Sequence, residues 1–238
     1  MKKHLIEKFK NKKAKIGVVG LGYVGLPFAV EKAKVGFTVI GIELNSEKVD
    51  MINNDRNYIS DVKDEDLSTV VNCGFLRAEN SFEIVKELDV IVIAVPTPLT
   101  KNLTPDISYI ESVTNEISKY LHKDMLICLE STTYPGTTEE IMQPILESTG
   151  LKVGDDFYLA HSPERVDPGN ARYTTKNTNK VVGGVGADSL EVAIEFYSQT
   201  IDTVVPVSSS RAAELVKVYE NTYRSVNGKN GKATANKT

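Results

Sequence analysis

The sequence predicts a doubly wound α/β domain, in which helices cover both faces of a parallel β-sheet. Short apolar runs rich in β-branched residues alternate along the chain with stretches of helical length, and this alternation is typical of βαβ units. Most runs are apolar at consecutive positions rather than at every second one, which indicates strands buried on both faces. With 238 residues, of which 41% are hydrophobic, the chain has enough apolar side chains for such a core.

Each expected strand is one of these apolar runs, and the expected helices lie between them. The strands, in chain order, are Lys15–Val19, Thr38–Ile42, a run beginning near Phe75, Val90–Ala94, Met125–Leu129, Tyr158–Ala160, Lys180–Val182 and Thr203–Val205. The helices with the clearest spacing are Val24–Val35, Ser46–Asn53 and Ile107–Tyr120. We assign residues 15–207 to this one domain.

Residues 1–14 form a basic extension in front of the domain. Within it, Leu5, Ile6 and Phe9 share one face of a helical pattern whose other positions include several lysines. A segment of this kind can lie on a membrane surface or pack against the domain. We expect it to pack against the domain.

The chain changes character after residue 207. Serines at 208–210 can cap a helix, and the apolar residues that follow recur at helical spacing as far as Val226. We therefore expect residues 208–227 to begin a long helix. Residues 228–238 contain no large apolar side chain, so we expect this segment to be a disordered tail.

Composition and charge exclude several classes of protein. The 28 basic and 32 acidic residues leave a net charge of −4, which is not the positive field of a nucleic-acid-binding protein. The sequence contains no apolar run long enough for a membrane helix and no signal-peptide pattern. We expect a cytoplasmic protein that is neither inserted nor exported.

The cysteines and histidines show no metal-ligand spacing. Cys73 and Cys128 are far apart in the sequence and too few for a disulfide framework, which favours a reducing compartment. We interpret both as buried structural thiols. His4, His122 and His161 are also isolated, and although His161 could line a site, we expect a structural role and no metal.

A glycine-rich turn, GLGYVG, occupies residues 20–25, directly after the first expected strand and before a helical pattern. In this context Gly20 permits a tight turn, Gly22 lets the backbone approach a pyrophosphate, and Gly25 lets the helix pack close to the strand. The helix N-terminus then presents N–H groups to the phosphates. The turn predicts a Rossmann-like dinucleotide site.

An acidic residue at the end of the second strand selects between the two nicotinamide cofactors. The Glu43 carboxylate can accept hydrogen bonds from both adenosine ribose hydroxyls, whereas the 2′-phosphate of NADP would meet a like charge. The sequence therefore predicts NAD. Lys48 can reach the adenosine side as well, or it can be a solvated helix lysine.

Polar segments follow three further expected strands, at the sheet edge where doubly wound folds bind ligands. Pro96-Thr97-Pro98 follows the fourth strand, ESTTYPGTT (residues 130–138) the fifth, and HSPERVDPGN (residues 161–170) the sixth. The expected cofactor-binding residues are Gly20, Gly22, Tyr23, Val24, Gly25, Glu43, Lys48, Pro96, Thr97, Ser131 and Thr132.

The motifs GLGYVGLP, PTP, ESTTYPGTT, SPERVDPGN and RAAELVKVYENTYRSVN, in this order between about residues 15 and 227, resemble the UDP-glucose/GDP-mannose dehydrogenase family. The resemblance implies oxidation of the C6 alcohol of a UDP-sugar to a carboxylate, with two hydride transfers to NAD. A cysteine of the family enzymes traps the aldehyde and forms a thioester. The products are precursors of polysaccharides.

The resemblance also implies roles for single residues. Thr132 would hydrogen-bond the hydrolytic water, and Glu164 would position the substrate and assist proton transfer. Lys217 and Asn221, four residues apart on one helix face, would stabilise negative charge at C6. The expected catalytic residues are Thr132, Glu164, Lys217 and Asn221, and the expected substrate contacts are Glu164, Arg165, Val166, Lys217 and Asn221. We expect the catalytic four to converge at the carboxyl edge of the sheet.

The sequence departs from the family pattern at two points. Pro168 occupies the position of a second acid in the UDP-glucose branch, so the hydrolytic base stays open, with Asp167 as the nearest carboxylate. Arg165 and the PERVDPGN form favour UDP-N-acetylglucosamine or UDP-N-acetylmannosamine, with UDP-glucose as a rival. No segment here matches the family's second domain, which supplies the nucleophilic cysteine and most uridine contacts.

These departures leave three functional hypotheses. The first is the cofactor part of a UDP-sugar 6-dehydrogenase, which in the complete family enzyme forms a homodimer through the long helix and which, as these 238 residues alone, lacks turnover. The second is an enzyme of the β-hydroxyacid dehydrogenase type, with one hydride step and no cysteine. The third is an NAD-binding module without catalysis.

Overall fold

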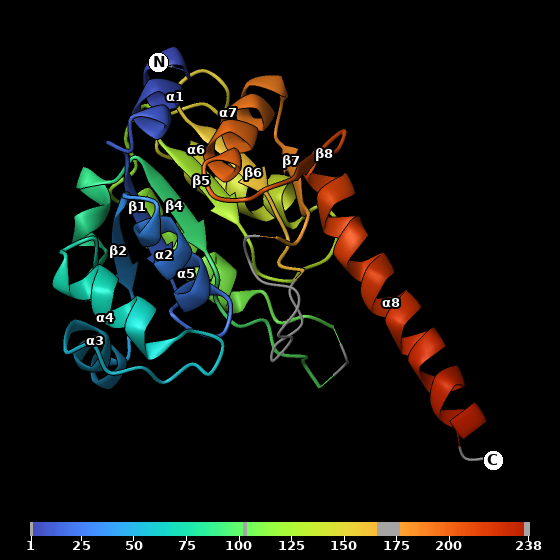
Figure 1. Ribbon diagram of the computed structural model, residues 1–238. Coiled ribbons are helices and arrows are strands. Elements are labelled where there is room, and N and C mark those ends of the chain that lie inside the picture. The colour runs from blue at the N-terminus through green and yellow to red at the C-terminus, as the bar shows by residue number, and fades with distance from the viewer. Residues whose placement is uncertain (1, 102–103, 166–176, 236–238) are drawn as a thin grey trace.

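The computed structural model describes residues 2–101, 104–165 and 177–235, and eight strands in these ranges form one sheet (Figure 1). The strand order is β3-β2-β1-β4-β5-β6-β7-β8. The strands are β1 (Lys15–Val19), β2 (Thr38–Ile42), β3 (Leu76–Glu79), β4 (Val90–Ile93), β5 (Leu126–Leu129), β6 (Tyr158–His161), β7 (Lys180–Gly184) and β8 (Val204–Pro206). The first six are parallel in the order 3-2-1-4-5-6, which confirms the doubly wound arrangement.

The last two strands correct the expectation of a wholly parallel sheet. β7 pairs with β6 in the antiparallel sense, and β8 pairs with β7 in the parallel sense. A parallel pair needs a crossover, usually a helix, and the described residues between β6 and β7 contain none. A helix follows β7 instead, and it serves as the crossover to β8.

Helices cover both faces of the sheet. They are α1 (Lys2–Lys10), α2 (Gly25–Lys34), α3 (Ser46–Asn53), α4 (Asp64–Asn72), the 3₁₀ helix η1 (Phe82–Glu87), α5 (Ser108–Ser118), the π-helical segment η2 (Thr137–Met142), α6 (Gln143–Glu147), α7 (Ala187–Ser198) and α8 (Ser210–Ala235). One core cluster joins α1, α2, α4 and α7 to one face, and the other joins η1, α5, η2 and α6 to the opposite face. No helix in the described ranges is long and apolar enough to cross a membrane.

The N-terminal helix packs on the domain, as expected. Leu5 and Phe9 of α1 are buried, and the ring centroid of Phe9 lies 5.5 Å from that of Phe196 on α7. The Lys2 ammonium lies 2.7 Å from carboxylate oxygens of both Asp188 and Glu191. The apolar face of α1 is therefore covered by α7 and is not available to a membrane surface.

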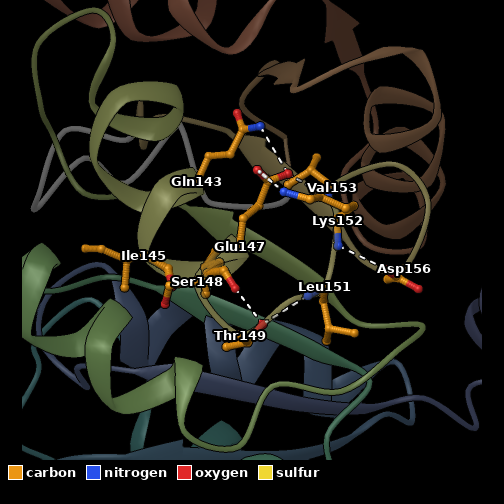
Figure 2. A network of polar contacts seen from close by, with 10 residues as sticks. Gln143, Ile145, Glu147, Ser148, Thr149, Leu151, Lys152, Val153 and Asp156 are labelled. Atoms are coloured by element: carbon orange, nitrogen blue, oxygen red, sulfur yellow. Dashed lines mark hydrogen bonds and ion pairs between the residues drawn. The ribbon is translucent and has the colours of Figure 1, made fainter.

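The turn between α6 and β6 is fixed by its own polar side chains (Figure 2). Glu147 Oε1 accepts a 3.1 Å hydrogen bond from the Val153 amide, and Asp156 accepts one of 3.0 Å from the Lys152 amide. These bonds satisfy backbone donors that no helix or strand pairs. The turn determines where the chain enters β6, and the carboxyl end of β6 leads to residues 162–165, Ser-Pro-Glu-Arg.

The long helix α8 is anchored to the domain at its N-terminal end. Glu214 is buried and accepts hydrogen bonds from the amides of Gly136, at 2.5 Å, and Thr138, at 2.8 Å. Ser210 Oγ donates to Glu139 at 2.6 Å. Beyond these contacts α8 projects away from the sheet (Figure 1).

The end of α8 differs from the sequence prediction. We expected disorder from residue 228, and the structure continues the helix to Ala235. A helix that is already nucleated and anchored extends at little cost per residue. This explains how a segment without large apolar residues can continue α8.

The close approach of α8 to the sheet generates a prediction about stability. A Cβ on Gly183 of β7 would lie 2.1 Å from the Ser209 carbonyl oxygen, whereas a Cβ on Gly22 would meet nothing within 4 Å. We expect Gly183→Ala to lower the free energy of unfolding by about 1–3 kcal/mol, because overpacking forces backbone shifts. Gly22→Ala is the matched control and should leave it unchanged. Equal urea midpoints for the two variants would contradict this packing.

Candidate functional site

The glycine turn is compact on one side and open on the other. Gly20 has a φ of 87°, and a Cβ on Gly25 would lie 1.8 Å from the Gly20 carbonyl oxygen. Both positions therefore need glycine. At Gly22 the space in the Cβ direction is empty, and no side chain caps the N-terminus of α2. An open cradle at a helix N-terminus fits a pyrophosphate.

Glu43 is held beside this turn. Its carboxylate accepts hydrogen bonds from the amides of Leu21, at 3.2 Å, and Asn45, at 3.1 Å, and its side chain is 13% exposed. Lys48 Nζ lies 3.7 Å from Glu43 Oε2, so Lys48 partly neutralises the carboxylate. The position agrees with a ribose-binding acid at the end of β2.

Tyr58 is a further residue at this turn, and sequence reasoning missed it. Its hydroxyl donates a 2.7 Å hydrogen bond to the Leu21 carbonyl oxygen, and Lys48 Nζ lies 5.7 Å from the centre of its ring. Tyr58 comes from the segment between α3 and α4, which has no periodic pattern to indicate a site. Tyr23, by contrast, is exposed at the opening of the turn.

The segments after β4 and β5 meet at the same edge of the sheet. Ser131 is buried, and its Oγ donates a 2.8 Å hydrogen bond to the Val95 carbonyl oxygen. Ser131 therefore ties the two segments together. Thr97 is half-buried, whereas Pro96 and Thr132 are exposed. The role of all four toward a cofactor stays a prediction.

The segment after β6 meets α8. Lys217 Nζ donates a hydrogen bond to the Glu164 carbonyl oxygen, and Glu164 Oε1 accepts one of 2.7 Å from the Arg165 amide. The Arg165 guanidinium pairs with Glu220 of α8 through both of its carboxylate oxygens, with Nε 3.2 Å from Oε2. Two contacts thus join α8 to the end of β6.

The expected convergence of catalytic residues is present for one pair. Glu164 and Lys217 are in contact. Asn221 is exposed and lies one turn beyond Lys217 on α8, and its convergence with Thr132 stays a prediction. Val166 lies outside the described residues. The sequence around Arg165 or Glu220 does not predict that these residues pair, because 55 residues separate them.

A buried charged group lies directly behind Glu164. Lys180 Nζ is 3.0 Å from Glu130 Oε2 and 3.3 Å from Glu164 Oε2. Tyr197 donates a 2.8 Å hydrogen bond to Glu130 Oε1. Burial raises the pKa of Glu130, which Lys180 opposes. Burial lowers the pKa of Lys180, but the two carboxylates outweigh it and leave that pKa above its usual value.

His161 is a neutral neighbour of this group. Burial, together with the charge of Lys180, lowers the pKa of His161 to about 3. Neither ring nitrogen has a hydrogen-bond partner among the described residues. At neutral pH the ring is therefore uncharged, in agreement with the structural role expected for it.

Neither cysteine can act at this edge. Cys128 is buried in β5, and burial raises the pKa of its thiol to about 12. Cys73 is exposed, so the expectation that it is buried was wrong: it follows α4, at a chain turn. It precedes β3, which places it at the amino edge of the sheet, opposite the site. Within the described ranges no cluster of acidic, histidine and cysteine side chains could hold a metal.

The fold and the glycine turn define a dinucleotide-binding domain of the Rossmann type. Residues 14–201 match the UDP-glucose/GDP-mannose dehydrogenase family, NAD binding domain, and the chain belongs to this family. Its cofactor is NAD.

Known relatives carry more specific names. The chain is 36% identical over 214 residues to UDP-N-acetyl-D-mannosamine dehydrogenase of Pyrococcus horikoshii, covering 90% of this chain and 51% of that protein. It is 34% identical over 215 residues to UDP-N-acetyl-D-glucosamine 6-dehydrogenase of Salmonella typhi, covering 90% and 50%. The chain spans about half the length of these curated relatives.

Solved structures show the same correspondence. The P. horikoshii enzyme superimposes with a TM-score of 0.84 at 36% identity, over 90% of this chain and 51% of that one. A ternary complex of GDP-mannose dehydrogenase from Pseudomonas aeruginosa gives a TM-score of 0.82 at 28% identity, over 89% and 50%.

The geometry at Glu43 predicts selectivity for NAD over NADP. We expect about tenfold or more tighter binding of NAD, which corresponds to about 1.4 kcal/mol or more, because the 2′-phosphate would face the carboxylate. Calorimetric titration of the chain with each cofactor measures the difference. Glu43→Lys should weaken NAD binding, and Glu47→Gln, on the exposed part of α3, is the control. Equal dissociation constants for the two cofactors would refute this assignment.

Proposed function

We propose that this chain is the cofactor part of an NAD-dependent UDP-sugar 6-dehydrogenase that oxidises the C6 hydroxyl to a carboxylate. The contact between Lys217 and Glu164 at the carboxyl edge of an NAD-binding sheet carries the proposal. The substrate is UDP-N-acetylmannosamine or UDP-N-acetylglucosamine, in polysaccharide precursor synthesis. Relatives named for these two sugars and the PERVDPGN segment support this choice over UDP-glucose.

The residues of this edge supply binding and proton chemistry. When bound, NAD supplies the hydride acceptor. The Lys217 ammonium stabilises negative charge that develops on the C6 oxygen. The Glu164 carboxylate is fixed by the Arg165 amide, and it accepts a hydrogen bond or a proton from a substrate hydroxyl.

Two further residues complete the proposed site. Asn221 lies on the same face of α8 as Lys217, where its amide adds a donor toward the C6 oxygen. Thr132 follows β5 and is exposed, so its hydroxyl is available to hold the hydrolytic water.

We propose in addition that these 238 residues alone bind NAD without turnover. The family reaction needs a thiol to trap the aldehyde, whereas Cys128 is buried with a raised thiol pKa and Cys73 precedes β3 at the opposite edge of the sheet. The chain spans about half the length of the P. horikoshii relative. In the family, binding energy from the remote nucleotide supports positioning at the reacting carbon.

Cytoplasmic location stays a prediction from the cysteine pattern.

The exposed face of α8 supports a proposed homodimer contact in the complete enzyme. Several large apolar side chains on this helix lie open to solvent, namely Leu215, Val218, Tyr219, Tyr223 and Val226. An apolar stripe on a projecting helix is typical of an interface.

Assays of the chain with NAD and each UDP-sugar test this proposal. We expect NAD binding in calorimetry and no rise in NADH absorbance with UDP-glucose, UDP-N-acetylglucosamine or UDP-N-acetylmannosamine. Production of two NADH per sugar would contradict the proposal that the chain cannot turn over without a nucleophilic thiol. Turnover of a small hydroxy acid would favour the β-hydroxyacid dehydrogenase hypothesis instead.

A chimera distinguishes the dehydrogenase hypothesis from the hypothesis of an NAD-binding module without catalysis. The matching half of the P. horikoshii relative is replaced by this chain, and we expect two NADH per UDP-N-acetylmannosamine. Lys217→Met should abolish that turnover, because the oxyanion loses its cation. Lys119→Met, which removes an exposed surface pair with Glu116, is the control. A folded, NAD-binding chimera whose turnover survives Lys217→Met would refute the role of Lys217.

A further inference from the structure

Lys180 is a buried ammonium shared by two carboxylates. It begins β7, and its Nζ lies 3.0 Å from Glu130 Oε2 and 3.3 Å from Glu164 Oε2. The side chains of Lys180, Glu130 and Glu164 are 4%, 0% and 15% exposed. The three charges are therefore largely removed from solvent.

The arrangement fixes Glu164 from two sides. One carboxylate oxygen of Glu164 accepts from the Arg165 amide at 2.7 Å, and the other faces Lys180. Its own carbonyl oxygen accepts from Lys217. Lys180 thus contacts the functional end of Glu164, whereas Lys217 contacts its backbone.

A buried ion pair of this kind often adds little net stability to a fold. Removing charges from water costs free energy that a pair only partly recovers, and an apolar packing of the same volume is often as stable. The surrounding core already supplies aromatic side chains, since Lys180 Nζ lies 5.4 Å from the Tyr197 ring centre and 6.0 Å from that of Phe28. The charges at this position call for a role other than packing.

The two carboxyl groups that share the Lys180 ammonium differ in burial. Glu130 is fully buried, and burial together with the charge of Glu164 raises its pKa. Glu164 is nearer to solvent and keeps the ammonium of Lys180 beside it. Burial therefore opposes ionisation of the Glu130 carboxyl group, and the Lys180 ammonium favours it.

We propose that Lys180 is a positioning residue for Glu164, which holds the Glu164 carboxylate ionised and in place, with Glu130 as its second, buried anchor. The inference rests on the proposed function only for the role of Glu164 toward the substrate. The contact itself involves no cofactor and no sugar, so it can be tested separately.

Other charged or titratable groups surround this contact. They are Glu130 at the end of β5, His161 on β6, Arg165 with its partner Glu220, Tyr197 on α7, Lys32 on α2, whose pKa burial lowers far more than Glu130 raises it, and Lys217 on α8. Of these groups and Lys180, it is Lys180 whose ammonium lies 3.3 Å from Oε2 of the Glu164 carboxylate.

Carbon-13 NMR titration of the Glu164 carboxyl group, assigned with Glu164→Gln, tests the proposal on the whole chain. The background is Glu130→Gln, which removes the fully buried carboxylate that would otherwise lose its cation when Lys180 is replaced, and which keeps an acceptor for Tyr197. We expect Lys180→Met in this background to raise the pKa of Glu164 by about one unit or more, a tenfold change in proton affinity. Lys180→Arg should restore it.

Lys15→Met is the matched control, because Lys15 also begins a strand and pairs with a carboxylate, Glu87, at 2.9 Å. It should leave the Glu164 titration unchanged. An unchanged Glu164 titration in Glu130→Gln/Lys180→Met would overturn the proposal.

If Glu130→Gln/Lys180→Met does not fold, titration of Lys180 in a Glu164 variant tests the same contact. We expect Glu164→Gln, which keeps the size of the side chain, to lower the pKa of the Lys180 ammonium in nitrogen-15 spectra. No change would equally overturn the inference. Failure of the proposed function would appear instead in the NADH assay of the chimera, with these titrations unaffected.

Discussion

The docking of α8 against the end of the sheet is the contact on which the site depends. Buried Glu214 accepts hydrogen bonds from the amides of Gly136 and Thr138, and Gly183 lets the start of α8 approach β7. These contacts fix the rotation of α8 about its axis. Lys217, three residues beyond Glu214, therefore reaches Glu164. A helix seated in another register would present a different face to the end of β6.

The two halves of the site obey different physical rules. At the glycine turn the requirement is absence of side chains, because a Cβ on Gly25 would lie 1.8 Å from the Gly20 carbonyl oxygen, and the space in the Cβ direction of Gly22 is empty. At the α8 end the requirement is paired charge in a partly buried environment, where unpaired groups are costly. The parallel strands β1, β4, β5 and β6 bring both halves to one edge.

Local patterns in the sequence predicted the parts of the molecule that depend on neighbours in the chain. The glycine turn, Glu43 at the end of β2 and the helical spacing of Lys217 and Asn221 are of this kind. The reversal of β7 and β8, the pairing of Arg165 with Glu220 and the Lys180 group are contacts between distant segments, and no local pattern encodes them. Cys73 was misjudged because an apolar run after a cysteine does not reveal which sheet edge it occupies.

A crystal structure of the chain with NAD tests the central claim most directly, namely that one sheet edge holds both the cofactor and the Lys217–Glu164 contact. We expect the pyrophosphate over Gly22, the adenosine ribose on Glu43, and the nicotinamide end toward Thr132 and Glu164, with Lys217 still on the Glu164 carbonyl oxygen. NAD bound away from Gly22, or Lys217 on the opposite edge of the sheet from the nicotinamide ring, would contradict it.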